Sequence, residues 1–433
     1  MPISPYCKAY PAPGRPGHTL LFSTRKASLS VLPAGAVTRL ERGDVPDGAA
    51  GPLERLGVLA PDPEAERREV LGLLDEVNRV DPGVTAAVIL GMSCNFACPY
   101  CYEGTLKGTG AMSASTAEAL VAFAARRLGP GKTRLTLDFY GGEPLLYLER
   151  LRQIASALRP VAEERGAAFS FTLVTNGSLL TPDVVTGLLP LGLAAARVTL
   201  DGPAETHDRS RPLRTGGGSF EAVLANVQAC CDLAPLAVGG NYTRENWREF
   251  PRLLDRLEAS GLGPGRLAQV RFEPVVQVRS RFAPPEFAAG CLSADEPWVV
   301  EASLALREEV LRRGFKTARI QPTPCMADLD DAFTVHWDGG LYKCLALVGH
   351  PEFAAGDLWS GPRDHRAAYG GERWRTEARC CACEYLPLCF GGCRYLRYQR
   401  EGRMDGVECR KAYLDAALEA LVQQDALHRH GVR

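Results

Sequence analysis

The stretch TAAVILGMSCNFACPYCYEG, from Thr85 to Gly104, carries the clearest structural information in the chain. Its first part, Thr85–Met92, is a short and mostly apolar run of the kind expected for a strand buried on both faces of a parallel sheet. Directly after this run, Cys94, Cys98 and Cys101 fall in one short loop. The stretch therefore predicts a buried strand that ends in three closely spaced thiols.

The same strand pattern returns five times downstream, and helix-compatible segments separate the strands. The predicted strands span residues 85–92, 134–140, 168–174, 195–200, 235–243 and 267–276. Strands that alternate with helices form parallel βαβ units, and a run of such units makes a complete or partial barrel. We expect an α/β fold around a partial (β/α)6 TIM-like barrel, with its site at the carboxyl ends of the strands.

The segment SASTAEALVAFAARRLG, residues 113–129, is the first predicted helix after the cysteine loop. Ser115 is the predicted N-cap, and Glu118 three residues later completes a capping box. Arg126 and Arg127 fall in the last turn, and Gly129 is the predicted end of the helix.

Three successive predicted strands end in short polar turns, Gly141-Gly142-Glu143-Pro144, Thr175-Asn176-Gly177 and Thr199-Leu200-Asp201-Gly202. The carboxyl ends of parallel strands meet at one edge of a sheet, so we expect these turns to converge on one site. Each turn taken alone has a simpler explanation, because Asn-Gly and Asp-Gly are common turn formers.

The overall composition narrows the function classes. Lys and Arg number 50 and Asp and Glu 51, so the balanced charge gives no general attraction to nucleic acid or to an anionic membrane. No signal-peptide pattern is present at the N-terminus, and no segment has the ~20 apolar residues of a membrane helix. We expect a cytoplasmic enzyme, in which fifteen cysteines indicate metal or catalytic sulfur rather than disulfides.

Eleven of the fifteen cysteines form two groups with a cysteine-poor span between them. Three thiolates in one loop can hold a four-iron cluster and leave one iron open for a ligand. An open position is typical of a reactive site rather than a structural one. A structural zinc site whose fourth ligand is distant in sequence is the alternative. The second group lies in the last quarter of the chain and comprises Cys325, Cys344, Cys380, Cys381, Cys383, Cys389, Cys393 and Cys409.

The motif Cys94-x3-Cys98-x2-Cys101, with Tyr100 before its last cysteine and a strand before the loop, resembles the cluster motif of radical S-adenosylmethionine (SAM) enzymes. This resemblance implies that the methionine part of SAM chelates the open iron and that reductive cleavage gives a 5′-deoxyadenosyl radical, which abstracts a substrate hydrogen. It also implies cofactor contacts in the polar turns. The GGEP turn (Gly141, Gly142, Glu143, Pro144) would hold the SAM ammonium, and the carboxylate would bind Arg211. The ribose and methionine parts would lie near Thr175, Asn176, Thr199 and Asp201.

The later cysteines resemble the SPASM domain, which holds two auxiliary [4Fe-4S] clusters, so the resemblance implies three [4Fe-4S] clusters in all. A zinc ribbon is the alternative for paired cysteines. The family spacing assigns Cys380, Cys383, Cys389 and Cys409 to the outer auxiliary cluster. It assigns Cys325, Cys344 and Cys393 to the inner one.

The inner set lacks one cysteine that full-complement relatives such as sulfatase maturases carry shortly before the Cys325 position. Here that stretch is FKTARIQPTP, residues 315–324. Either Cys291 or another thiol completes the inner site, or its iron is open to a substrate thiolate. We favour the open iron.

Three parts are predicted: an N-terminal module (1–84), the partial barrel (85–315) and the SPASM domain (316–433). The first contains a hairpin-like segment (18–33) and a helical one (64–78). Its size and pattern are similar to those of modules in maturases of ribosomally made peptides, which implies binding of a precursor peptide through its leader. Alternatively, the module covers the open side of the barrel.

The resemblance therefore implies an oxidoreductase that modifies a peptide, with a sulfur-to-carbon thioether cross-link as the first choice. Formylglycine formation of the sulfatase-maturase type, carbon–carbon cross-linking and epimerisation are the alternatives. A reducing protein such as flavodoxin or ferredoxin is the expected electron donor.

Overall fold

A computed structural model describes residues 1–277, 289–370 and 372–431 of the chain. Its main feature is a sheet with six parallel strands in chain order. These are β4 (Gly83–Ile89), β5 (Arg134–Tyr140), β6 (Ala168–Thr175), β7 (Leu193–Thr199), β8 (Leu236–Tyr242) and β9 (Gln269–Pro274). The sheet stays open, because β9 lies at one edge and no described strand joins it to the other edge. The expected partial barrel is confirmed, with all six predicted strands present.

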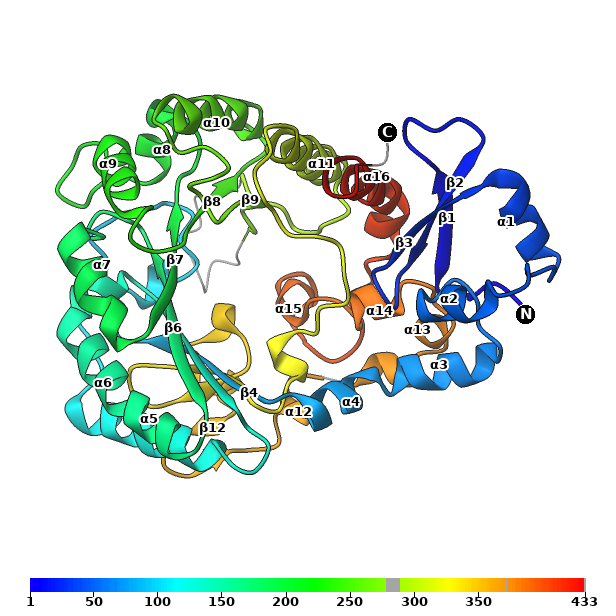
Figure 1. The fold of residues 1–433 in the computed structure, drawn as a ribbon. Helices are drawn as coiled ribbons and strands as arrows, with labels where there is room; N and C mark the ends of the chain where they lie inside the picture. The colour runs from blue at the N-terminus through cyan, green and yellow to red at the C-terminus, as the bar shows by residue number, and fades with distance from the viewer. Residues whose placement is uncertain (278–288, 371, 432–433) are drawn as a thin grey trace.

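Helices cover the outer face of the curved sheet, as the ring of green and cyan ribbons in Figure 1 shows. Apolar strand residues such as Leu137, Phe139 and Phe171 are fully buried in the core between strands and helices. These helices are α5 (Ala114–Arg127), α6 (Leu148–Glu164), α7 (Pro182–Leu188), α8 (Ala204–Ser210), α9 (Phe220–Cys230) and α10 (Phe250–Ala259).

Helix α5 starts one residue earlier than the predicted cap. Ser113, not Ser115, is the N-cap, and its Oγ accepts a hydrogen bond from the Thr116 amide at 3.0 Å. The Met112 amide donates to the Leu90 carbonyl at 2.8 Å. This contact fixes the chain directly before Ser113, so the helix begins at the next residue, Ala114. The prediction of Ser115 as N-cap was wrong, whereas both arginines do lie in the last turn.

The C-terminal segment adds to the main sheet. Strand β10 (Ala332–Val335) lies parallel to β4 and pairs antiparallel with β11 (Leu341–Tyr342). This pair forms a hairpin around the turn Asp338-Gly339-Gly340. Helix α11 (Pro297–Arg312) precedes this segment. The remaining elements of the segment are β12 (Gly356–Asp357), β13 (Gly361–Pro362), α12 (His365–Ala368), α13 (Ala378–Cys381), α14 (Leu386–Cys389), α15 (Arg394–Glu401) and α16 (Lys411–Arg429).

The N-terminal residues form a small antiparallel sheet and short helices. The predicted hairpin is confirmed as β2 and β3, while the helix expected over 64–78 is two helices that meet at Gly72. The bounds are β1 (Cys7–Pro11), β2 (His18–Ser23), β3 (Leu29–Pro33), α1 (Ala34–Glu41), α2 (Ala50–Arg55), α3 (Pro63–Leu71) and α4 (Leu73–Val80).

The N-terminal sheet packs against the C-terminal segment. Phe22 of β2 shares one apolar cluster with Leu418 and Val422 of α16, and Leu74 of α4 shares another with Trp374. Both ends of the chain therefore lie together beside the open side of the barrel (Figure 1).

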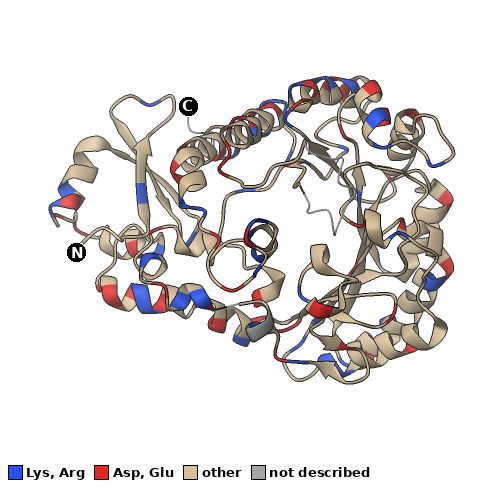
Figure 2. Ribbon diagram, turned by 180° about the vertical axis from the view of Figure 1, so that it is seen from behind, with Lys and Arg blue, Asp and Glu red and all other residues tan. Residues whose placement is uncertain are grey.

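Both signs of charge are mixed along the outer helices (Figure 2). No helix within the described residues is both long enough and apolar enough to cross a membrane.

Candidate active site at the open end of the sheet

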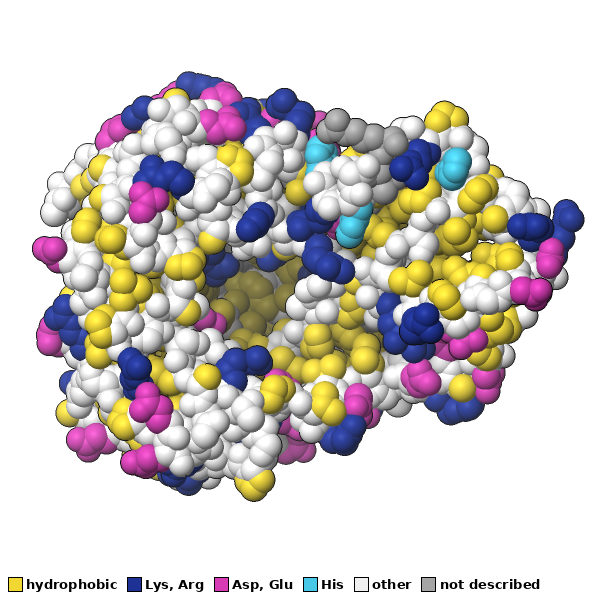
Figure 3. Space-filling view, viewed as in Figure 1, with side chains coloured by type: hydrophobic (Ala, Val, Ile, Leu, Met, Phe, Trp, Pro, Cys, Tyr) yellow, Lys and Arg dark blue, Asp and Glu magenta, His cyan; other side chains and the backbone are white. Residues whose placement is uncertain are grey.

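A cavity of about 380 Å³ lies where the carboxyl ends of the strands meet the cysteine loop. This volume falls in the range of small-molecule sites. Figure 3 shows a hollow in the middle of one face of the molecule with hydrophobic side chains inside it. The cavity wall includes residues of the cysteine loop, of the ends of β5 to β9 and of the C-terminal segment, from which Ala346 and Tyr395 come.

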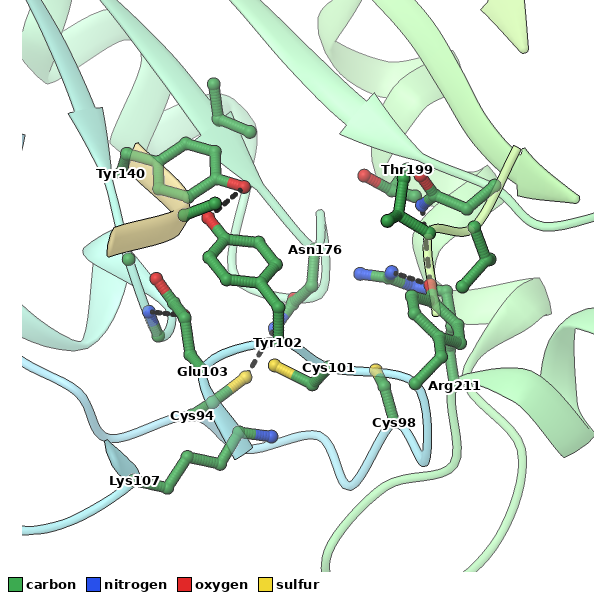
Figure 4. A pocket seen from close by; sticks show the side chains of 18 of the residues that line it. Cys94, Cys98, Cys101, Tyr102, Glu103, Lys107, Tyr140, Asn176, Thr199 and Arg211 are labelled. Atoms are coloured by element: carbon green, nitrogen blue, oxygen red, sulfur yellow. Dashed lines mark hydrogen bonds between the residues drawn. The ribbon is translucent and has the colours of Figure 1, made fainter. Parts of the chain in front are cut away.

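Cys94, Cys98 and Cys101 all line this cavity, and Figure 4 shows their sulfur atoms side by side. Burial raises the pKa of Cys98, and burial followed by the charge of Glu103 raises the pKa of Cys101 to about 12. A coordinated iron would hold such thiols as thiolates.

The donor chemistry suits an iron–sulfur cluster better than a single metal ion. In the described part of the chain, no three Cys, His, Asp or Glu side chains are arranged to hold one ion. A four-iron cluster instead needs thiolates spread around a cube. Three sulfurs on one cavity wall, with space in front of them, meet that need.

Backbone contacts fix the cysteine loop in place. The Ala97 amide donates to the Pro212 carbonyl and the Arg214 amide donates to the Asn95 carbonyl, each at 2.9 Å. Phe96, between them, is fully buried in the core. The loop is therefore held by the segment that also carries Arg211.

Arg211 belongs to a buried network beside the cluster loop. Its Nη1 donates to the Tyr100 hydroxyl at 2.7 Å, and the Tyr100 hydroxyl donates to Asp201. Arg211 also lies 3.7 Å from the Asp201 carboxylate, which accepts from the Asn241 amide at 2.6 Å. Burial raises the pKa of Asp201, and Arg211 opposes that rise. Asp201 therefore orients Tyr100 and Arg211 from behind the cavity wall.

The Glu143 carboxylate also accepts hydrogen bonds from other residues of the protein. Its Oε1 accepts from the Leu145 amide at 3.1 Å and from the Thr175 hydroxyl at 2.7 Å, and its Oε2 accepts from the Asn176 amide at 2.8 Å. Its side chain has no exposed surface. The structure thus places Glu143 where it ties two strand ends together.

The predicted cofactor contacts divide into two groups. Glu143, Pro144 and Asp201 are absent from the cavity wall. The residues that do line it are Tyr100, Gly141, Gly142, Thr175, Asn176, Thr199 and Arg211.

Gly142 is a position where only glycine fits. Its φ is +47°, in the left-handed region, and a Cβ there would clash with the Ser93 carbonyl oxygen. This close approach lets the Gly142 amide donate to Glu103 Oε2 at 2.9 Å.

The wall residues that were not predicted include Tyr102, Glu103, Lys107 and Tyr140. The Tyr102 hydroxyl donates to the Tyr140 hydroxyl at 2.9 Å, and both lie above the cysteines in Figure 4. Burial raises the pKa of the Glu103 carboxyl above its usual value. The available signal was a charged residue two positions after Cys101, in a loop whose neighbours are mostly apolar or aromatic.

Cys344 and Cys380 each have other late cysteines among their electrostatic neighbours. Burial followed by the neighbouring Cys393 and Cys325 raises the pKa of Cys344. Burial followed by Cys389 raises the pKa of Cys380 to about 12, with smaller contributions from Cys409 and Cys383.

Cys291 has different neighbours from the inner set. Its amide donates to the Val275 carbonyl at 2.8 Å, and burial followed by the charge of Glu296 raises the pKa of its thiol to about 11.

Sequence comparison matches the barrel part of the chain to a known superfamily. Residues 88–257 match the Radical SAM superfamily. The chain is 24% identical over 344 residues to the PqqA peptide cyclase of Granulibacter bethesdensis, across 76% of this chain and 87% of that protein.

Two further relatives from Methanosarcina barkeri align over a shorter region. The chain is 29% identical over 169 residues to an Fe-coproporphyrin III synthase, 38% of each protein. It is 29% identical over 180 residues to an AdoMet-dependent heme synthase, 40% of this chain and 46% of that protein. The chain thus spans less than half the length of these two curated relatives.

Solved structures share the fold. anSMEcpe with bound AdoMet and the Kp18Cys peptide superposes with a TM-score of 0.63 at 17% identity, over 78% of this chain and 98% of that one. Streptococcus suis SuiB bound to S-adenosylmethionine superposes with a TM-score of 0.55 at 14% identity, over 94% and 99%.

Proposed function

We propose that this chain, which contains a radical SAM domain at residues 88–257, installs a sulfur-to-carbon thioether cross-link in a ribosomally made peptide. One observation carries the proposal. The three cysteines of the loop share a cavity wall with Tyr395, whose ring lies within electrostatic reach of Cys344 and Cys393. A substrate in that cavity would touch both the cluster loop and the inner auxiliary site.

The comparisons support a peptide substrate. The relatives and structures that align over most of this chain include the PqqA peptide cyclase, anSMEcpe with the Kp18Cys peptide and SuiB bound to its precursor peptide SuiA. The chain's N-terminal module, residues 1–84, is the proposed binding site for a leader segment, since it presents the edges of a three-stranded antiparallel sheet.

Cys94, Cys98 and Cys101 would hold the [4Fe-4S] cluster that binds SAM. When bound, cluster and SAM supply the 5′-deoxyadenosyl radical that removes a hydrogen atom from the substrate. The protein contributes position and shielding. Arg211 and Tyr100 are held in the wall through Asp201, and a substrate that fills the cavity would shield the radical from water.

The C-terminal segment would hold two further clusters in a SPASM domain at residues 316–433. Cys380, Cys383, Cys389 and Cys409 would bind the outer cluster. Cys325, Cys344 and Cys393 would bind the inner one, with an iron left open for the substrate thiolate. The thioether needs loss of one S–H and one C–H hydrogen, which is a two-electron oxidation. The C–H hydrogen atom would go to the 5′-deoxyadenosyl radical, the S–H proton would go to solvent when the thiolate forms, and the auxiliary clusters would accept the remaining electron. Flavodoxin or ferredoxin would be the reducing partner.

Anaerobic reaction with a cysteine-containing precursor peptide tests the proposal. A thioether removes two hydrogens from the peptide and consumes its thiol, so alkylation of the product by iodoacetamide should fail at the cross-linked cysteine. Fragmentation of the modified peptide in the mass spectrometer should release no fragment ions that separate the two cross-linked residues. Reaction of the product with a hydrazide would indicate formylglycine instead, and an unchanged mass would indicate epimerisation.

Metal analysis tests the cluster count independently. Three clusters correspond to about twelve irons per chain and one cluster to about four. Little iron together with bound zinc would contradict the proposal.

A further inference from the structure

A tight backbone link joins the two cysteine sets of the C-terminal segment. It runs over three residues, from Cys389 at the end of α14 to Cys393 directly before α15. Cys389 is an electrostatic neighbour of Cys380, and Cys393 is one of Cys344, so the ends of the link belong to different proposed clusters. The Gly392 amide donates to the Cys389 carbonyl at 2.8 Å. The link is therefore a turn whose two ends lie close together.

The segment before α16 packs directly against this link. The Glu408 amide donates to the Gly391 carbonyl at 2.9 Å, and the Cys393 amide donates to Glu408 Oε2 at 3.3 Å. The approach requires glycine at position 392, because a Cβ there would lie 1.8 Å from the Glu408 carbonyl oxygen. The link therefore fixes the position of Arg410, two residues further along the chain.

Arg410 lies beside both cysteine sets. Burial raises the pKa of the Cys389 thiol, and a hydrogen bond from the Arg410 amide opposes that rise. Burial lowers the pKa of the Arg410 side chain, but the charges of Glu408 and of the two cysteines at the ends of the link outweigh that effect and raise it. One cation therefore faces the outer set through Cys389 and the inner set through Cys393.

The Arg410 guanidinium has an N–H group that no described residue accepts. Its Nε is buried and has no hydrogen-bond partner among the described residues, although 39% of the whole side chain is exposed. Glu408 Oε2, at 3.6 Å, is within ion-pair distance but too far for a hydrogen bond. A buried donor without an acceptor is costly, and the sulfur atoms of an iron–sulfur cluster accept hydrogen bonds. The donor and the thiols on either side of it therefore fit an adjoining cluster.

We propose that Arg410 raises the reduction potentials of both auxiliary clusters and so makes them able to take the electron that cross-link formation releases. This inference rests on the two auxiliary clusters of the proposed function. Uptake of one electron makes a cluster more negative, so a nearby cation and an N–H donor stabilise its reduced form. In each turnover the substrate loses that one electron and a cluster gains it.

Glu408 has the opposite effect on the inner cluster. Its carboxylate is 2% exposed and lies between two cations, with Oε2 3.6 Å from Arg410 and Oε1 3.7 Å from Arg400. A buried negative charge beside the Cys393 amide disfavours an added electron, so neutralising it should raise the potential of the inner cluster. The two neighbouring side chains therefore predict shifts of opposite sign.

The test is a redox titration of the auxiliary clusters in the full chain, followed by electron paramagnetic resonance. The C94A/C98A/C101A background removes the signal of the SAM-binding cluster. In this background R410Q should lower the ratio of reduced to oxidised cluster at a fixed potential by about tenfold or more for both clusters, and each tenfold change is about 59 mV for one electron. R410K keeps the charge and loses the Nε donor, so its decrease should be smaller.

Two further variants in the same background complete the comparison. R403Q removes a cation from the same segment whose side chain is 62% exposed, and it should leave both potentials unchanged because solvent and salt screen that charge. E408Q keeps the shape of the side chain, and it should raise the ratio of reduced to oxidised cluster at the inner site.

A second readout connects the potentials to the reaction. In protein with the intact cysteine loop, R410Q should release more 5′-deoxyadenosine for each thioether formed, because a cluster of lower potential takes the electron less readily. An unchanged ratio of the two products would overturn this part of the proposal.

The outcomes separate the proposed function from this inference. If the background variant holds no iron, the auxiliary clusters of the proposed function are wrong and the inference falls with them. If it holds about eight irons and R410Q leaves both potentials unchanged, the inference is wrong and the function stands. A shift of one cluster alone, or an equal shift in R403Q, would also overturn the shared role of Arg410. If R410Q loses its iron, E408Q decides, because an unchanged inner potential would contradict the inference.

Discussion

At the scale of single residues, the site depends on close backbone approaches that side chains would prevent. The Gly142 amide donates to Glu103, and a Cβ at this position would clash with the Ser93 carbonyl oxygen. We expect G142A to lower SAM affinity and to destabilise the fold by about 1–3 kcal/mol, because alanine is strained at this positive φ and clashes with the Ser93 carbonyl. Urea denaturation and SAM dialysis measure the two effects.

Gly129 gives the matched control for that change. A Cβ there would meet no atom within 4 Å, so G129A should leave both stability and SAM affinity within error of wild type. Equal effects of the two substitutions would contradict the role given to Gly142.

His207 gives a pH-dependent prediction at the same scale. Its Nδ1 accepts from the Asp201 amide at 3.1 Å and its Nε2 pairs with the Ser219 hydroxyl at 3.0 Å, so the folded protein needs the neutral ring. Burial, reinforced by Arg211, lowers its pKa to about 3. The unfolded chain binds this proton near pH 6.5, so between those values unfolding takes up a proton and stability falls as pH falls, by up to about 1.4 kcal/mol per pH unit.

The histidine contribution is measured against a variant without it. The free-energy difference between wild type and H207Q in urea unfolding should shrink from pH 7 to pH 5. A difference that stays constant over this range would show that His207 does not titrate on unfolding.

At the scale of elements, the strands were predictable and their surroundings less so. Strand β5 begins and ends where the alternation of RLTLDFY predicts. In this strand every second side chain is buried, so the alternation of apolar residues is visible in the sequence. The N-cap of α5 was missed because Ser113 and Ser115 are equivalent in local pattern, and the contact between Met112 and Leu90 decides between them. Tertiary contacts of this kind leave no local signal.

The candidate site shows the same limit. The cysteines and the glycine turn have characteristic spacing, so sequence alone identifies them. Glu103 is a single acid in a loop without periodicity, and its place in the wall depends on its contact with the Gly142 amide, 39 residues away in sequence. The hydrogen bonds that Glu143 accepts from Thr175 and Asn176 likewise form only because the ends of two strands lie together in the fold.

The link between the end of β7 and the cysteine loop can be tested through Asp201. D201N keeps the shape of the side chain and removes the charge that faces Arg211. Because the pair is buried, with side chains 11% and 0% exposed, we expect a loss of about 3 kcal/mol or more in the free energy of unfolding. Guanidinium denaturation of the metal-free protein measures it.

Glu205 on the neighbouring helix α8 is the control for that experiment. Its pair with Arg252 is exposed on both sides, at 60% and 53%, so E205Q should change stability by less than about 1 kcal/mol. A D201N effect no larger than that of E205Q would mean that the network does not hold the loop.

At the scale of the whole molecule, one cavity collects residues from segments far apart in sequence. The cysteine loop follows the first parallel strand, Arg211 follows the fourth, and Tyr395 belongs to the C-terminal segment. The N-terminal sheet packs on α16 of the same segment. The arrangement explains why an open barrel suits this chain, since its open side admits the cysteine-rich segment and leaves an approach for a peptide.

The central claim is that Cys94, Cys98 and Cys101 hold the cluster that cleaves SAM. The most direct measurement is 5′-deoxyadenosine formation by anaerobic, iron-loaded protein with SAM and dithionite, in wild type and in the triple variant C94A/C98A/C101A. The account predicts release of 5′-deoxyadenosine by wild type, none by the variant, and retention by the variant of the iron held by the C-terminal cysteines. Continued 5′-deoxyadenosine formation by the variant would contradict it.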